Sequence, residues 1–178
     1  MARTRSDVRV GVQRLSDAAG SLVKATPGSS GYDLSSAEQQ EVIIEPGQVR
    51  MVRTGIALEL PPGLEGQVRS RSGLAARSGV FVLNSPGTID SDYRGEIKIV
   101  LANLGSAPFV VHTGDRIAQL VFVQVPQVQL VAVSQLTATE RGSGGFGSSG
   151  KEALGRSPAP GGTASVAPEP HAGRSKAS

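Results

Sequence analysis

The sequence predicts an all-β protein, and three observations support this. Residues 8–133 consist largely of short runs in which apolar and polar side chains alternate, these runs are rich in Val and Ile, and turn-forming residues separate them. A period of two is typical of strands with one buried face, and no stretch of about ten residues shows the period of a helix. Roughly a dozen short strands at this spacing indicate a sandwich, barrel or jelly roll.

The expected strands follow the alternating runs in chain order. They are residues 8–12, 41–45, 48–60, 79–83, 96–104, 108–112, 116–123 and 128–133. Turns are expected at the intervening segments PGSSG, EPGQ, PPGLEG, SPGT and TGD, because Gly, Pro and Asp favour turn conformations. The segment SGLAAR (72–77) can form one turn of helix. Since large aromatics are scarce and a core of Val, Ile and Leu buries limited apolar surface, we also expect a subunit interface.

Composition divides the chain into three parts. Residues 1–140 hold the alternating runs and are expected to form the β domain. Residues 141–150, RGSGGFGSSG, are expected to be a flexible arm, and the single aromatic side chain among its glycines, Phe146, suggests that the arm docks onto something. Residues 151–178 are mostly Pro, Ala, Gly and Ser and cannot bury enough apolar surface to offset their ordering entropy, which predicts a disordered tail.

Composition also excludes or disfavours several classes of protein. The absence of cysteine excludes disulfides, thiolate metal sites and cysteine nucleophiles. No apolar run approaches about 18 residues, so we expect no membrane span. The N-terminus has neither the apolar core nor the cleavage site of a signal peptide, which predicts a cytoplasmic protein. The net charge of +3 comes from the two ends of the chain rather than from its middle, and we therefore expect no nucleic-acid binding.

The available side chains limit the chemistry. The chain has two histidines, of which His171 lies in the C-terminal tail and His112 ends an apolar run, where a structural role is expected. A general base must therefore be a carboxylate, and a metal is expected to be Mg²⁺ held by oxygen atoms. The segment GFGSSGK (145–151) only partly matches a phosphate-binding loop, because Glu152 replaces the required Ser or Thr and no strand leads into it.

Five polar, glycine-rich segments recur between the expected strands. They are SSGYDLSS (29–36), RSRSGLA (69–75), NSPGTIDSDYRG (84–95), TGDRIAQL (113–120) and RGSGGFGSSG (141–150). In this order and spacing they resemble the five motifs of the trimeric dUTP pyrophosphatases, or dUTPases. The resemblance implies a β jelly roll, a homotrimer whose active sites draw on several subunits, and hydrolysis of dUTP to dUMP and pyrophosphate with Mg²⁺.

The resemblance implies that the third segment binds uracil and deoxyribose and supplies the catalytic base. Uracil is expected to insert into the hairpin that begins at Asn84, whose amide helps backbone groups to recognise the uracil edge. Asp90 is the implied catalytic base, and Tyr93 is expected to pack under the deoxyribose and exclude a 2′-hydroxyl. The residues implied in this part of the site are Asn84, Thr88, Ile89, Asp90, Tyr93 and Lys98.

The first, second and fourth segments are the implied phosphate and metal end of the site. Asp33 is expected to orient Mg²⁺-bound water, and Gln119 to donate to an α-phosphate oxygen. The second segment is expected to hold phosphate oxygens through Ser72 and Gly73 at the start of a helical turn, where free N–H groups suit an anion. Arg71 is expected either to add positive charge there or to fix the trimer. Two further residues of the fourth segment are expected to be structural, as an ion pair in the core of the assembly, namely Asp115 and Arg116.

The fifth segment is the implied closing arm. Phe146 is expected to stack over uracil and Arg141 to bind the γ-phosphate when the arm closes. Other phosphate oxygens are expected to be covered by residues that follow the aromatic ring, namely Gly147, Ser148, Ser149 and Gly150.

Two alternatives share this sequence pattern. The related dCTP deaminases are expected to need a Glu close to the third segment, where this chain has Asp90 and Asp92, with Glu96 further on. A nucleotide-binding regulator without catalysis is the other. Pyrophosphate release from dUTP alone supports the hydrolase, ammonia release from dCTP supports the deaminase, and no turnover supports the regulator.

Overall fold

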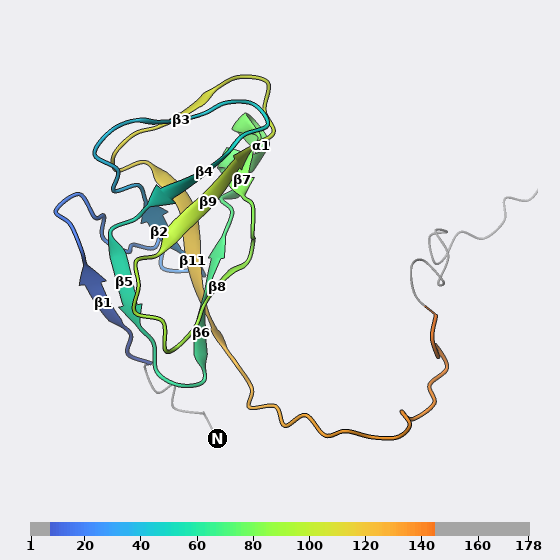
Figure 1. The fold of residues 1–178 in the computed structure, drawn as a ribbon. Coiled ribbons are helices and arrows are strands. Elements are labelled where there is room, and N and C mark those ends of the chain that lie inside the picture. Colours follow the sequence, from blue (N-terminus) through green and yellow to red (C-terminus); the bar gives the residue numbers. More distant parts are fainter. Residues whose placement is uncertain (1–7, 145–178) are drawn as a thin grey trace, which may run out of the picture. The chain divides into compact units, whose positions relative to one another are not determined.

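A computed structural model describes residues 8–144 of the chain (Figure 1). These residues belong to two units, of which the first ends at Leu130 and the second begins at Val131. The first unit is a β domain. The described part of the second, residues 131–144, contains no helix or strand. The expected division into a β domain, an arm and a tail stays a prediction.

The described residues form eleven strands and one short helix. In chain order these elements are β1 (Gly11–Arg14), β2 (Tyr32–Ser35), β3 (Val42–Ile44), β4 (Val49–Arg53), β5 (Ile56–Glu59), β6 (Leu64–Arg69), α1 (Ser72–Ser78), β7 (Val80–Val82), β8 (Gly87–Ile89), β9 (Lys98–Asn103), β10 (Phe109–Val111) and β11 (Arg116–Gln124). The helix is too short to span a membrane.

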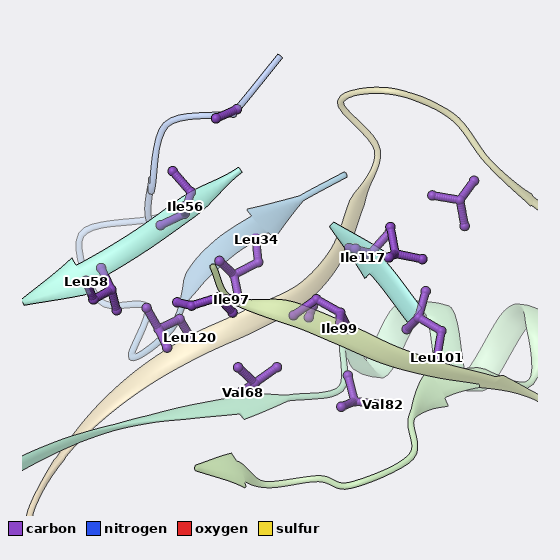
Figure 2. Close-up of a cluster of buried hydrophobic side chains, with 14 of the residues drawn as sticks. Leu34, Ile56, Leu58, Val68, Val82, Ile97, Ile99, Leu101, Ile117 and Leu120 are labelled. Carbon is purple, nitrogen blue, oxygen red and sulfur yellow. The ribbon is translucent and has the colours of Figure 1, made fainter. Parts of the chain in front are cut away.

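Two larger sheets enclose a single core. One has the strand order β2-β11-β6-β8 and the other β4-β9-β7, while β1 pairs with β5 and β10 with β3. Every one of these pairings is antiparallel. Both large sheets turn branched aliphatic side chains inward, as Figure 2 shows for Leu34, Val68, Ile117 and Leu120 of the first sheet and for Val82, Ile99 and Leu101 of the second. The predicted all-β jelly-roll class is confirmed.

Most expected strands are present, with bounds that shift by a few residues. The segment 128–133 is an exception, because it forms no strand, and the prediction of a strand there is wrong. Its apolar side chains are exposed, including Val128 at 71% and Leu130 at 92%. Alternation predicts that a segment can form a strand, but the backbone groups of residues 128–133 pair with no strand among the described residues.

The alternation does not predict β6, although β6 lies in the middle of the first sheet. The strand buries Leu64, Gly66 and Val68 in alternation, and the glycine breaks the apolar pattern. A Cβ atom at Gly66 would lie 3.1 Å from Leu120 Cδ1 and 3.3 Å from Ile89 Cβ. Glycine is therefore favoured here, because a Cβ atom would be crowded by side chains of the two neighbouring strands, β11 and β8.

Replacing Gly66 with Ala should lower the free energy of unfolding by about 1–3 kcal/mol, the usual cost of forcing an extra carbon into a packed core. Gly28 is the matched control, because a Cβ atom there would meet no atom within 4 Å. Gly28→Ala should change stability by less than about 0.5 kcal/mol. Denaturant unfolding at equal protein concentrations measures both, and equal effects of the two changes would contradict the packing argument.

Candidate active site

A cavity of about 520 Å³ opens beside the third glycine-rich segment. It contains all six residues that the sequence implicates there. The complete lining is Met51, Val68, Val82, Asn84, Gly87, Thr88, Ile89, Asp90, Tyr93, Glu96, Ile97 and Lys98. The cavity therefore combines apolar side chains of core strands with amide, hydroxyl, carboxylate and ammonium groups, as small-molecule sites usually do.

Strand β8 fixes one wall of this cavity. It pairs with β6 in the register Ile89 to Gly66 and Thr88 to Gln67. Asp90 follows the last residue of β8, and the chain then turns, with the Tyr93 N–H donating to the Asp90 carbonyl over 3.1 Å. The turn places the Asp90 carboxylate and the Tyr93 ring on the same cavity. No side chain of residues 8–144 bonds to the Asp90 carboxylate, which leaves it available to a ligand.

The first, second and fourth segments form a separate polar cluster. The Asp33 carboxylate, which is 11% exposed, accepts from Arg71 Nε at 3.2 Å and from Arg116 Nη1 at 2.9 Å. Arg71 Nη1 also donates to the Arg116 carbonyl at 2.9 Å. One largely buried carboxylate thus binds two arginines from different elements, and their positive charges lie where the sequence predicts phosphate binding.

Gln119 joins this cluster through the sheet. Its Cα is paired with Asp33 on one side and with Arg69 on the other. Its side-chain amide donates to the Ser70 carbonyl at 2.9 Å. A Cβ atom at Gly31 would collide with Gln119 Oε1 and lie 3.2 Å from its Cβ. Glycine at position 31 therefore allows Gln119 to pack directly against the backbone of the first segment.

The expected ion pair between Asp115 and Arg116 is not formed within this chain. Arg116 bonds to Asp33 instead. The Asp115 carboxylate accepts from the His112 backbone N–H at 2.8 Å and so closes its own turn. Within one chain these neighbours in the sequence belong to a turn and to a strand, which gives each of them a different partner. Their ion pair in the core of the assembly stays a prediction.

The second segment enters helix α1 as the sequence predicts. Arg71 has an extended backbone, and Ser72 and Gly73 are the first residues of the helix. The sequence did not identify Arg77, which lies one turn later on the same helix. A Cβ atom at Gly73 would lie 3.1 Å from Arg77 Nη2, so this guanidinium lies over the start of α1. Its i, i+4 spacing from Gly73 is the signal that could have found it.

Sequence reasoning also assigned no site role to Glu96 and Arg53. Glu96 lines the cavity, and its carboxylate is 11% exposed and lies 3.1 Å from Arg53 Nε. Glu96 and Lys98 are two residues apart at the entry to β9, and this period-two spacing is the only signal in the sequence that groups them. The partner, Arg53, is 43 residues away along the chain and could not be inferred.

Two parts of the candidate site remain apart in one chain. No residue of the polar cluster (Asp33, Arg71, Arg116 and Gln119) lines the cavity. Ile89 is paired with Gly66 of β6, and Gln119 with Arg69 of β6. The two positions are three residues apart on β6, which is about 10 Å along the strand. Strands β8 and β11 lie on opposite sides of β6, which separates them by about 10 Å across the sheet.

The closing arm is only partly described. Arg141 lies in the second unit, where its Nε donates to the Gly144 carbonyl at 2.9 Å. The remaining predicted arm residues lie outside the described range, namely Phe146, Gly147, Ser148, Ser149 and Gly150.

Comparisons with known proteins bear directly on this site. The family model described as dUTPase matches residues 17–150. A deoxyuridine 5′-triphosphate nucleotidohydrolase of Anaplasma marginale is 56% identical over 126 residues, which are 71% of this chain and 86% of that protein. Another of Gloeobacter violaceus is 54% identical over 143 residues, which are 80% of this chain and 97% of that protein.

Solved structures agree with the family match. A mutant dUTPase of Staphylococcus bacteriophage 80alpha, determined with dUpNHpp, is 28% identical and has a TM-score of 0.73 over 80% of this chain and 98% of that chain. A mutant dUTPase of phage phi11 of S. aureus, described with a structural Mg(II) ion, is 25% identical with a TM-score of 0.66 over 71% of this chain and 97% of that one. Sequence, fold and cavity lead to one assignment: this chain belongs to the dUTPase family.

Proposed function

We propose that the protein hydrolyses dUTP to dUMP and pyrophosphate. The cavity beside β8 supports this proposal, because it is lined by the residues expected to bind uracil and deoxyribose and by the expected catalytic base, Asp90. Asp90 accepts a proton from a water molecule, whose oxygen attacks the α-phosphorus. The bond from the α-phosphorus to the oxygen that bridges to the β-phosphate then breaks, and pyrophosphate leaves. In the cell this reaction would keep uracil out of DNA and supply dUMP for thymidylate synthesis.

Selectivity for deoxyuridine follows from the shape and polarity of the cavity. Backbone groups of residues 84–90 and the Asn84 amide would bond to the uracil edge, while cytosine presents donors and acceptors in reversed order. A site built to bond one pattern rejects the other strongly, because its buried polar groups are left unpaired. Tyr93 would pack against the deoxyribose and leave no space for a 2′-hydroxyl. Lys98 adds a positive charge to the same rim.

The polar cluster would bind the phosphate end of the nucleotide. Gln119 would donate to an α-phosphate oxygen, and the Ser72 hydroxyl and Gly73 N–H at the start of α1 would bind other phosphate oxygens. Arg71 adds positive charge. Electrostatic stabilisation of this kind supplies most of the catalysis in phosphoryl transfer, because the protein has little covalent chemistry to perform.

Mg²⁺ fits this phosphate end in an indirect mode. Residues 8–144 contain no group of three or more His, Asp or Glu side chains that could hold a metal ion directly. Asp33 already accepts from two arginines, so it would orient the ion through metal-bound water while the triphosphate supplies direct oxygen ligands. When bound, the ion neutralises charge on the phosphate oxygens.

We further propose a homotrimer in which one copy completes the site of another. The separation between the cavity and the polar cluster within one chain supports this, since Asp90 and Gln119 must act on the same α-phosphate. Exposed apolar side chains also border the cavity. Met51 is 59% exposed and lines it, and Leu83, which directly follows β7, is 52% exposed. A second copy that covers this apolar surface would meet the cavity as well.

Subunit sharing predicts complementation between two inactive variants. Asp90→Asn removes the base. Ser72→Asp places a negative charge where phosphate binds, at an exposed first-turn position where Asp suits the helix. Refolding an equal mixture should restore up to about one quarter of the wild-type rate, because one site in four would combine two intact contributions. Each variant refolded alone is the control. A site contained in one chain would give no recovery, because every chain carries one defect.

One observation favours the dCTP deaminase alternative, because Glu96, a glutamate close to the third segment, lines the cavity. Its oxygens, however, already accept from Arg53 Nε and from the Gly55 N–H, at 2.9 Å for the latter. A carboxylate engaged in this way is poorly placed to shuttle protons. The geometry therefore does not favour a deaminase.

A substrate panel tests the proposed function. Release of pyrophosphate and of ammonia should be measured with dUTP, dCTP and UTP at equal concentrations. We expect pyrophosphate from dUTP and little from the other two. Ammonia from dCTP would establish the deaminase, and no product from any nucleotide would leave a binding protein. The cytoplasmic location stays a prediction.

A further inference from the structure

The Glu96 carboxylate ties the loop that carries Tyr93 to the neighbouring strands. It is 11% exposed and forms an ion pair with Arg53 at the end of β4. It also accepts from the Gly55 N–H at 2.9 Å, between β4 and β5. A largely buried carboxylate with two donors from another segment is a strong local tether, because charge-assisted hydrogen bonds are the stronger kind.

Backbone groups of Glu96 and of the next residue form further hydrogen bonds, on one side to Tyr93 and on the other to residues of β5 and of the turn before it. The Glu96 carbonyl accepts from the Tyr93 hydroxyl at 3.1 Å. The next residue, Ile97, donates its N–H to the Ile56 carbonyl at 2.8 Å and accepts from the Thr54 hydroxyl at 2.6 Å. The Tyr93 ring, which is 45% exposed, is therefore held at its hydroxyl end by a backbone group that is itself fixed to β4 and β5.

We infer that Glu96 is a positioning residue that holds the Tyr93 ring in the cavity and thereby sets the discrimination between deoxyribose and ribose. The inference rests on the proposed dUTP hydrolysis and extends it to the source of sugar selectivity. The ring can exclude a 2′-hydroxyl only if it cannot move away, since a mobile ring would admit the extra oxygen. Glu96 itself need not touch the nucleotide, because it acts through the loop.

The inference predicts a selective change in Glu96→Ala. The ratio of kcat/KM for dUTP to kcat/KM for UTP should fall about tenfold, as expected when a substrate-positioning group is displaced slightly. Glu96→Gln should lower the ratio less, because its amide oxygen can still accept from the Gly55 N–H while the ion pair with Arg53 is lost. This milder variant also serves if the alanine variant does not fold.

The matched control is Glu41→Ala. Glu41 is a carboxylate that also contacts a basic side chain, His112 Nδ1 at 3.1 Å, but it does not line the cavity. Glu41→Ala should leave the ratio of kcat/KM for dUTP to kcat/KM for UTP unchanged. Thermal unfolding of each variant separates a local effect on the sugar from a general loss of structure, because a merely destabilised enzyme loses dUTP and UTP turnover in equal proportion.

A double-mutant cycle with Tyr93→Phe tests whether Glu96 acts through the tyrosine hydroxyl. If it does, the two changes together should lower the ratio less than the product of their separate effects. An unchanged ratio in folded Glu96→Ala and Glu96→Gln would overturn the inference, and so would independent effects in the cycle. Absence of dUTP turnover by the wild-type protein would instead refute the function on which the inference rests.

Discussion

Replacing Asp90 with Asn should lower kcat for dUTP at least about a hundredfold, the scale of a general base, while dUTP still binds. Asn keeps the size of the side chain but cannot accept the proton of the attacking water. The Asp90 carboxylate lines the cavity and has no side-chain partner in residues 8–144, so its replacement should not disturb the fold. Single-turnover kinetics measures the chemical step, and calorimetric titration with a non-hydrolysable analogue measures binding.

Asp92→Asn is the matched control for this prediction. Asp92 is an exposed carboxylate in the same turn, two residues away, and it does not line the cavity. It should retain a near-normal rate, because turn formation tolerates Asn as well as Asp. A near-normal rate in Asp90→Asn, or an equal loss in both variants, would refute the role of Asp90 as the base.

Ending the chain at Glu140 should lower kcat/KM for dUTP by about a hundredfold or more, because the implied arm could no longer close over the bound nucleotide and exclude water. Ending it at Gly150 should leave the rate unchanged, because only the predicted tail is removed. The two truncations differ only in residues 141–150. Steady-state kinetics on dUTP provides the comparison, and circular dichroism checks that the β fold is kept in both.

Phe146→Ala in the full-length chain separates the aromatic ring from the rest of the arm. It should reproduce much of the loss caused by the shorter truncation, since the ring is expected to stack over uracil. Unchanged turnover after truncation at Glu140 would remove the closing-arm hypothesis. A large loss after truncation at Gly150 would show instead that residues 151–178 contribute to the site.

The sequence predicted six of the residues that line the cavity, because these six are close to one another along the chain. Asn84, Asp90 and Tyr93 lie in one short segment of the chain, so a motif read along the sequence already groups them. Long-range contacts were beyond such reasoning. The ion pair between Glu96 and Arg53 joins residues 43 positions apart, and nothing in the local pattern of either residue identifies the other.

Strand prediction failed where the local pattern and the sheet disagree. Strand β6 has Gly66 at a buried position, and the reason for it is the packing of Leu120 and Ile89, which no local pattern contains. The segment 128–133 alternates well but finds no strand edge among the described residues. Within one chain Arg116 pairs with Asp33, because β2 and β11 are neighbours in the sheet.

The most direct test of this account is a structure of the oligomer with a non-hydrolysable dUTP analogue. We expect the uracil to lie against residues 84–90 with the Asp90 carboxylate beside the α-phosphorus, and the phosphates to contact Ser72 and Gln119 of a neighbouring copy. A nucleotide bound outside this cavity would contradict the account. So would phosphates that contact Ser72 and Gln119 of the same chain that supplies Asp90.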